Sequence, residues 1–271
     1  MGDHLNSGLI AGRNWGGIPS RQQCVDIHCH CLPGLDDGPQ TLTDALELCR
    51  ALVNDGISTV IACPHQLGRC DGRNSPAIVR EAVTDLNNAL ATENIPLAVL
   101  PGGDVRLDER IASLCDTDGI LTVADSRQYL MLEFPDGVFM DITRLVNDLR
   151  SRGLQIIISH PERNGALVRQ PHAVARLIDS GALLQLTAAS ITGDFGPVAE
   201  RAAWHWLMFG SAVLVATDAH DTNGRRPRMS DAMTLIAAKL GHDAARRVCI
   251  DNPRRVLTGR PRLTATEGAH E

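Results

Sequence analysis

The chain has 271 residues, a formal net charge of −6, and 44% hydrophobic and 21% charged residues. This length suits one α/β barrel or two ordinary domains, and the composition is that of a soluble globular protein with a sizeable core. Aromatic residues make up only 3% of the chain, which together with the acidic balance argues against a nucleic-acid partner.

The two ends of the chain differ in composition from its middle. Residues 1–23 hold no apolar stretch long enough for a secretory signal, and no run approaches the roughly 20 apolar residues of a membrane span. The eight cysteines form no C-x-x-C pair, and several lie in apolar runs. These features predict a cytoplasmic protein with reduced thiols and no membrane insertion, in which a flexible extension (1–23) and a flexible tail (260–271) flank one domain, 24–259.

Short apolar runs rich in β-branched residues alternate with segments of helical period, which is typical of βα units. The predicted strands are 24–29, 58–63, 97–101, 129–134, 154–159, 182–187 and 212–217. The predicted helices are 41–54, a segment starting after Ser75-Pro76, 138–152, 171–180, 197–209 and a last pair within 228–258. The strands are apolar almost throughout, as expected when both faces are covered. This alternation predicts an α/β fold that closes into a distorted, seven-stranded TIM-like barrel.

Histidines and carboxylates gather where the predicted strands end. The residues in these positions are His28, His30, His65, Asp104, Glu133, His160, Glu162, Asp218 and His220. In a barrel the carboxyl ends of all strands surround one mouth, so these side chains are expected to converge. Any one of them alone is more often a hydrogen-bonded loop residue. Six strand ends that all carry such groups favour a metal site, because these groups are unfavourable beside an apolar core unless they are paired or bind metal.

The residue types narrow the choice of metal. Imidazole and carboxylate together suit Mn, Fe, Zn, Co or Ni, whereas a thiolate-rich set would indicate structural zinc. Alternation along a strand places His28 and His30 on one face and Cys29 and Cys31 on the other, so the cysteines are expected to pack against helices. The candidates are too many for one ion, and two or three ions that share Glu133 would account for them.

A metal cluster flanked by arginines is suited to the hydrolysis of phosphate esters. The metals generate a hydroxide near neutral pH and hold the phosphoryl oxygens. Arg163 in HPER, and Arg225, Arg226 and Arg228 after TDAH, are candidates to neutralise charge on the transferred group. For any one of the last three, a solvated surface loop is an equally good explanation.

The segments DIHCHCLPGLDDGP, ACPH, LPGGDVRL, LEFP, SHPER and TDAH, in this order, resemble the PHP (polymerase and histidinol phosphatase) superfamily. More narrowly, they resemble the bacterial CpsB/CapC-type protein tyrosine phosphatases, over about residues 24–258. The resemblance implies a distorted (β/α)7 barrel with two or three divalent ions, manganese first and iron, zinc or cobalt as alternatives. The implied ligand sets are His28, His30, Glu133 and Asp218; then Glu133, His160 and Asp104; and then Asp37, His65 and His220. Asp104 departs from the family pattern, in which this position is Glu.

The resemblance also implies hydrolysis of phosphotyrosine on the tail of a bacterial tyrosine autokinase that governs capsule or exopolysaccharide synthesis. We expect a metal-bridged hydroxide to attack phosphorus in line, with an arginine on the phosphoryl oxygens and assistance from His65 or His220 where these are not held by metal. A cysteine nucleophile is not expected: Cys63 is followed by Arg69 in a C-x5-R spacing, but His65 lies between them and matches a ligand position.

Three alternatives stay open from the sequence. A PHP phosphatase acting on histidinol phosphate or another small phosphate ester is the nearest. A metal-dependent amidohydrolase is weaker, because the only lysine, Lys239, lies after the last metal motif and does not suit a bridging carboxylated lysine. A non-catalytic, metal-binding regulator of polysaccharide export is the third. The sequence permits a homo-oligomer and does not specify one.

Overall fold

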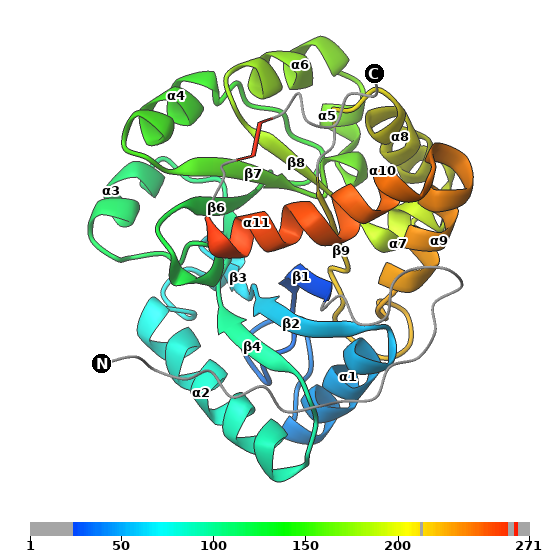
Figure 1. The fold of residues 1–271 in the computed structure, drawn as a ribbon. Coiled ribbons are helices and arrows are strands. Elements are labelled where there is room, and N and C mark those ends of the chain that lie inside the picture. Colours follow the sequence, from blue (N-terminus) through cyan, green and yellow to red (C-terminus); the bar gives the residue numbers. More distant parts are fainter. Residues whose placement is uncertain (1–23, 212–213, 260–262, 265–271) are drawn as a thin grey trace, which may run out of the picture.

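The computed structural model describes residues 24–211, 214–259 and 263–264 (Figure 1). The predicted flexible extension, 1–23, lies outside the described residues, as does most of the predicted tail. The single domain 24–259 therefore stays a prediction. Within the described residues, no helix is long and apolar enough to cross a membrane.

All strand pairs are parallel, and the strands form two sheets. The three-stranded sheet has the order β1 (Cys24–Cys29), β2 (Ile57–Ala62) and β4 (Ala98–Pro101). The six-stranded sheet has the order β3 (His65–Gln66), β5 (Asp104–Arg106), β6 (Tyr129–Glu133), β7 (Gln155–Ser159), β8 (Leu183–Thr187) and β9 (Leu214–Ala216). The α/β class with parallel strands is confirmed.

The predicted closed barrel of seven strands is not confirmed, because the described strands form two sheets rather than one closed sheet. The predicted strands 58–63 and 97–101 both lie in the three-stranded sheet, as β2 and β4, but the chain leaving each of them enters a short strand of the other sheet, β3 and β5 respectively. The two sheets also meet where β1 adjoins β9. There, Cys29 and Ala219 form an isolated parallel bridge, and the N–H of His30 donates to the carbonyl of Ala219 at 2.9 Å. We call this junction, residues 28–30 and 217–219, the seam.

Helices cover the outer faces of the strands (Figure 1). The helices are α1 (Leu42–Asn54), α2 (Pro76–Thr92), α3 (Ile111–Asp116), α4 (Thr143–Ser151), α5 (Gly165–Val168), α6 (Pro171–Asp179), α7 (Ala188–Ile191), α8 (Gly196–Met208), α9 (Met229–Leu240), α10 (His242–Arg246) and α11 (Asn252–Thr258). Helix α1 packs on β2, α2 on β4 and α4 on β7. Short turns of helix at η1 (Gly68–Cys70), η2 (Val123–Asp125), η3 (Pro161–Arg163) and η4 (Arg247–Asp251) complete the set.

The predicted helix starts are correct where a capping residue is present. Thr41 accepts a hydrogen bond from the N–H of Asp44 at 3.2 Å and begins α1, and Ser75 accepts one from Ile78 at 3.5 Å and begins α2. The helix predicted from 138 instead begins at Thr143, after an N-cap position, Ile142, that makes no side-chain capping bond. The predicted pair of helices within 228–258 is in fact three, α9, α10 and α11, with the π-helical turn η4 between the last two.

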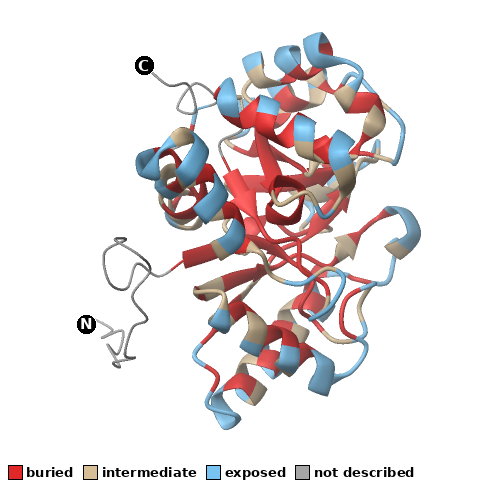
Figure 2. Cartoon of the chain, turned by 90° about the vertical axis from the view of Figure 1, so that its right-hand side faces the viewer, coloured by how far each residue is buried: buried red, intermediate tan, exposed pale blue. Residues whose placement is uncertain are grey.

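Two clusters of buried apolar residues make up the core. The inner cluster draws on strands of both sheets: Val25, Ile27, Ile61, Cys63, Val123, Tyr129, Met131, Ile157, Leu183, Leu214, Ala216, Val256 and Leu263. The larger, outer cluster lies between the strands and the helices, and it includes Cys29, Cys31 and Cys49. The prediction that the first two of these cysteines pack against helices is thus confirmed. Figure 2 shows buried strands at the centre and helices exposed on their outer faces.

Strand β1 changes the face that it presents to the inner cluster. Ile27 belongs to the inner cluster and Cys29 to the outer one, although strict alternation would place these two side chains on the same face. The ladder with β2 has a register shift between Asp26 and Cys29, which accounts for the change. The shift turns His28 and His30 toward the carboxyl ends of the other strands.

Candidate metal centre

All nine residues predicted as metal ligands come together, at or beyond the carboxyl ends of β1, β2, β4, β6, β7 and β9. His28 lies in β1, His30 just after it, His65 at the start of β3, Asp104 at the start of β5, Glu133 at the end of β6, His160 after β7, Asp218 and His220 after β9, and Asp37 in the loop between β1 and α1. Their donor atoms form four sets, each within 4.8 Å of one another: His30, Asp37, His65 and His220; His28, His30 and Asp104; His28, His160 and Asp218; and His65, Asp104 and Glu133. The structure groups Glu133 with His65 and Asp104. The first implied set had instead placed Glu133 with His28, His30 and Asp218.

Asp104 stands at the middle of the centre, although its side chain is one methylene shorter than Glu. It is fully buried. Its Oδ2 lies 3.5 Å from His65 Nδ1, 3.6 Å from His160 Nε2 and 3.8 Å from His28 Nε2. The shorter carboxylate therefore still reaches imidazoles from three different strand ends.

Asp218 lies on the other side of the centre, next to the two histidines of β1. Its Oδ1 is 3.4 Å from His28 Nε2 and 3.5 Å from His30 Nε2, and these two imidazole nitrogens are 3.2 Å apart. Asp218 is buried, as are both histidines. One carboxylate oxygen and two imidazole nitrogens thus point at one small volume.

The donor set fits a divalent cation. Asp104 Oδ2 and Asp218 Oδ1 are buried and have no hydrogen-bond partner, and a buried carboxylate oxygen without a donor is unfavourable. A cation held between them and the surrounding imidazoles satisfies both oxygens, and a mixed imidazole–carboxylate set suits Mn, Fe, Zn or Co.

A layer of side chains behind the centre orients its histidines and Asp104. The Oε1 of Gln185 lies 2.8 Å from His28 Nδ1, and Asp36 Oδ2 lies 2.7 Å from His30 Nδ1. The hydroxyl of Ser159 donates to Asp104 Oδ1 at 2.9 Å. These contacts turn His28 Nε2, His30 Nε2 and Asp104 Oδ2 toward the centre, as outer groups do at metal sites. Asp36, the neighbour of the predicted ligand Asp37, thus orients His30.

Burial and neighbouring charge set the protonation of the histidines. Burial, aided by the nearby His220, lowers the pKa of His30 to about 3, so this ring is neutral near pH 7 and offers a lone pair. Burial alone would lower the pKa of His65, but its hydrogen bond with Asp37 and the charges of Asp104 and Glu133 raise it to about 9. The pKa of Asp218 is held well below its usual range despite burial, by His28 and Arg225.

Two residues of the centre have backbone conformations that non-glycine residues rarely adopt. His160 has φ 32° and Asp218 has φ 51°, both in the left-handed region. Strained conformations of this kind concentrate at functional sites, where the surrounding structure holds them. Neither conformation could be predicted from the sequence, because both residues carry ordinary side chains.

The four predicted arginines divide into two pairs. Arg163 and Arg225 both form ion pairs with Asp218 Oδ2, and Arg225 Nη1 also lies 3.3 Å from Asp37 Oδ2. Arg228 instead pairs with Asp194 and Asp231, and Arg226 makes no ion pair within the described residues. Arg163 and Arg225 therefore adjoin the centre directly, and the other two line a neighbouring pocket.

One arginine at the centre was missed from the sequence. Arg106 Nη1 donates to Glu133 Oε2 at 2.8 Å, and the two residues are register partners in the β5–β6 ladder. Arg106 lies in the LPGGDVRL segment, but its approach to Glu133 depends on strand register. Glu162 is the reverse case: although it follows a predicted strand, its carboxylate is buried and accepts hydrogen bonds from Thr187 and Ser190. It belongs to none of the four sets.

Comparisons with known proteins agree on one family. The family model for capsular polysaccharide synthesis, CpsB/CapC, matches residues 24–258. Tyrosine-protein phosphatase YwqE of Bacillus subtilis is 35% identical over 220 residues, which is 81% of this chain and 86% of the relative. The putative tyrosine-protein phosphatase CapC of Staphylococcus aureus is 32% identical over 74% of this chain and 78% of its own length.

A solved structure supports the same relationship. It comes from crystallographic work on YwqE of Bacillus subtilis and CpsB of Streptococcus pneumoniae, described as unique metal-dependent tyrosine phosphatases. It superposes with a TM-score of 0.84 at 33% identity, covering 88% of this chain and 96% of the other. A lactonase template engineered for organophosphate hydrolysis superposes with a TM-score of 0.55 at 17% identity, a likeness of fold alone.

Proposed function

The chain belongs to the CpsB/CapC family of capsular polysaccharide synthesis proteins, and on that basis we propose that it is a metal-dependent protein tyrosine phosphatase. The observation that carries this proposal is the grouping of nine imidazole and carboxylate residues beside two arginines at one end of the strands. The residue types in this group suit the hydrolysis of phosphoric monoesters, because cation ligands are combined with guanidinium groups that match phosphoryl oxygens.

In this proposal His28, His30, Asp37, His65, Asp104, Glu133, His160, Asp218 and His220 hold two or three divalent ions, with manganese first among the candidates. The ions would activate water as the nucleophile and neutralise charge on the phosphoryl group. The four donor sets overlap through His28, His30, His65 and Asp104, which supports neighbouring ions with shared ligands.

The protein's own groups position the phosphoryl group. Arg163 and Arg225 both reach Asp218 from partly exposed positions, so their guanidinium groups flank the centre on its solvent side. Each presents a planar fork of N–H donors that matches phosphoryl oxygens in the transition state. His65 and His220 stand on either side of Asp37, with Nε2 atoms 3.4 and 3.3 Å from its Oδ1. Where they are not held by metal, they are placed to move a proton to or from the reacting group.

A cysteine nucleophile is disfavoured by the position of Cys63. The side chain is fully buried, and its Sγ donates to the carbonyl of Ile27 at 3.4 Å. Burial raises the pKa of this thiol well above its ordinary value, whereas a nucleophilic cysteine needs a thiolate in contact with solvent. We expect Cys63→Ser to retain turnover at full metal content.

We extend the proposal to the cellular role and to the fold. Phosphotyrosine on the tail of a bacterial tyrosine autokinase in the cytoplasm is the proposed substrate, and the family's link to capsular polysaccharide synthesis supports it. The absence of a disulfide among the eight cysteines is in keeping with that compartment. The two sheets are proposed to make up a distorted (β/α)7 barrel, supported by the passage of β2 into β3 and of β4 into β5, and by the seam.

The experiment pairs metal analysis with turnover. Purified protein is stripped with a chelator, reloaded with Mn²⁺, and assayed side by side on a phosphotyrosyl peptide and on histidinol phosphate. We expect peptide turnover to disappear on chelation and to return with Mn²⁺. Faster hydrolysis of histidinol phosphate would favour the small-ester phosphatase, and full metal occupancy without turnover of either substrate would favour a non-catalytic regulator.

A further inference from the structure

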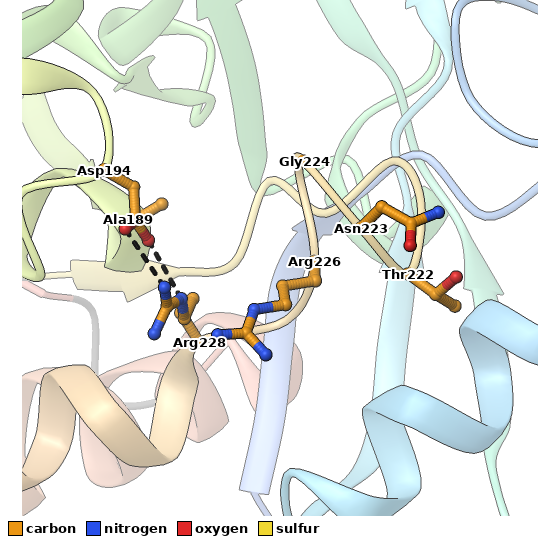
Figure 3. Close-up of a pocket in the computed structure, with 7 residues that line it drawn as sticks. All are labelled: Ala189, Asp194, Thr222, Asn223, Gly224, Arg226 and Arg228. Atoms are coloured by element: carbon orange, nitrogen blue, oxygen red, sulfur yellow. Dashed lines mark hydrogen bonds and ion pairs between the residues drawn. The ribbon is translucent and has the colours of Figure 1, made fainter.

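A pocket of about 620 Å³ lies beside the metal centre, between two loops (Figure 3). It is lined by Ala189, Asp194, Thr222, Asn223, Gly224, Arg226 and Arg228. One wall comes from α7 and the loop after it, and the other comes from the loop that follows β9. Neither the metal ligands nor the two arginines of the centre belong to this lining.

Both walls of the pocket adjoin the centre. In the loop after β9, Arg225 stands between lining residues Gly224 and Arg226, and its guanidinium reaches Asp218 at 2.8 Å. The carbonyl of Arg225 also accepts the N–H of His220 at 2.8 Å, which ties this loop to the centre. On the other wall, Phe195 follows Asp194 in the chain and lies under the guanidinium of Arg163, 4.2 Å from the ring centroid.

The pocket carries one guanidinium without a counter-ion. Arg228 is held by Asp194, with its Nη2 at 3.0 Å from Oδ1, and by Asp231 at 2.8 Å. Arg226 is exposed, and in the part of the chain that the structure describes it forms no ion pair or hydrogen bond. In Figure 3 its side chain extends toward Arg228, so two guanidinium groups share one side of the pocket and only one of them is neutralised. Although the chain has a net charge of −6, the pocket therefore carries local positive charge, which favours an anion.

We propose that this pocket binds an acidic side chain of the substrate polypeptide, next to the phosphotyrosine, through Arg226. The inference rests on the proposed function, because it places the phosphoryl group at Arg163 and Arg225. A guanidinium fork matches a carboxylate, and Thr222 and Asn223 supply further polar groups in the lining. An extended polypeptide advances about 3.3–3.6 Å per residue, so side chains within three residues of the phosphotyrosine are the candidates to reach a pocket beside the centre. Arg228, fixed by its two aspartates, shapes the wall.

The test compares phosphotyrosyl peptides that differ only in charge. A single Glu is placed at each of the three positions on either side of the phosphotyrosine, and each peptide is matched by one with Gln. For the Mn²⁺-loaded wild type we expect kcat/KM to favour Glu over Gln by about three- to tenfold at one position, mainly through KM. In Arg226→Gln the Glu:Gln ratio should fall to about one, and in Arg226→Glu the preference should move to a peptide with Lys at that position.

The controls distinguish a local effect of Arg226 from a general loss of charge, from unfolding, and from failure of the proposed function. Arg152→Gln removes the same charge from an exposed arginine directly after α4, at the opposite ends of the strands, and should leave the Glu:Gln ratio at the wild-type value. Thermal unfolding of each variant checks that the fold is intact. Peptide turnover with no Glu preference at any position, or a preference that survives Arg226→Gln, would overturn the subsite alone. No turnover of any phosphotyrosyl peptide would overturn the proposed function and the subsite with it.

Discussion

A single buried glutamine sets the orientation of His28. Gln185 is fully buried in β8, and its Oε1 lies 2.8 Å from His28 Nδ1 while its Nε2 donates to the carbonyl of Leu186 at 2.8 Å. With Nδ1–H bound to the amide oxygen, Nε2 is left to face the centre. The glutamine thus acts on the centre through His28, and it belongs to none of the four donor sets itself.

Replacing this glutamine should weaken metal binding while the ligands stay in place. We expect Gln185→Leu to lower Mn²⁺ affinity by about 10–100-fold, because outer hydrogen bonds to ligating histidines have effects of this size. Competition with a chelator of known affinity measures the change. Gln155→Leu is the matched control: it also removes a buried strand glutamine, but one that donates to Gly181 and Leu263. Equal losses of affinity in the two variants would contradict an orienting role.

His65 makes a pH-dependent contribution to the stability of the metal-free protein. Its pKa in the folded state is raised from 6.5 to about 9, so this contribution is fully present below pH 6.5 and is lost as the pH rises through 9. The difference in unfolding free energy between wild type and His65→Asn, measured in chelator, should shrink by about 1–2 kcal/mol over this range. This figure is reduced from the full shift because Asp37 is 55% exposed. A difference that stays constant or grows with pH would contradict the assignment.

At the scale of elements, an aspartate that follows one helix accepts hydrogen bonds from the first backbone N–H groups of another helix, which is distant in sequence. Asp55 follows α1, and its carboxylate accepts the N–H of Met229 at 2.6 Å and the N–H of Ser230 at 3.2 Å, the first residues of α9. The hydroxyl of Ser230 donates to the same carboxylate. No residue at the N-terminus of α9 supplies a side-chain cap of its own, so Asp55 takes that position.

Removing this carboxylate should destabilise the whole chain. We expect Asp55→Ala to lower the free energy of unfolding by about 1–2 kcal/mol, the usual effect of losing a cap, and Asp55→Asn to lower it by less, because one oxygen acceptor remains. Urea denaturation measures both. Asp85→Ala, at an exposed position in α2, is expected to change stability by less than about 0.5 kcal/mol. Equal free energies of unfolding for Asp55→Ala and Asp85→Ala would show that the contact between Asp55 and α9 does not stabilise the protein.

The elements that the sequence predicted are those with a long, regular pattern. All seven predicted strands overlap observed ones, and β1 has the predicted bounds, because continuous β-branched apolar runs are a strong signal. Strands β3 and β5, of two and three residues, are too short to show a period, as are α5 and α7 with four residues each. They appear only when neighbouring chain segments pair.

The same limit applies to the candidate centre. The nine predicted ligands could be found because each follows a recognisable strand or lies in a recognisable motif. Gln185 and Ser159 showed only as polar residues in apolar runs, and the partner that each meets depends on tertiary packing. Arg106 faces Glu133 through strand register, and the left-handed backbone of His160 has no sequence signal at a non-glycine residue.

At the scale of the whole molecule, the centre takes its ligands from both sheets. His28 and His30 belong to the three-stranded sheet or follow it, whereas Asp104 and Asp218 belong to the six-stranded sheet or follow it. A bound ion should therefore stabilise the assembly of the two sheets. At a free Mn²⁺ concentration of 100 times the dissociation constant, we expect the free energy of unfolding to rise by about 2.7 kcal/mol per site.

Thermal unfolding across a series of Mn²⁺ concentrations measures this gain, and a chelator should reverse it. Glu133→Gln is the comparison variant, since it keeps the shape of the side chain and removes one anionic ligand; its unfolding temperature should rise less at each concentration. An unfolding temperature that does not respond to Mn²⁺ in the wild type would contradict a centre that joins the sheets.

The seam gives the centre a kinetic property. His30 donates its backbone N–H to Ala219 at 2.9 Å, and Asp218 donates its own to His28 at 2.8 Å, so the residues whose side chains would hold an ion are also those whose backbones close the seam. An ion held between these side chains would also hold the two backbone segments together. Deuterium exchange at the amides of His30 and Asp218 should therefore slow when Mn²⁺ is bound.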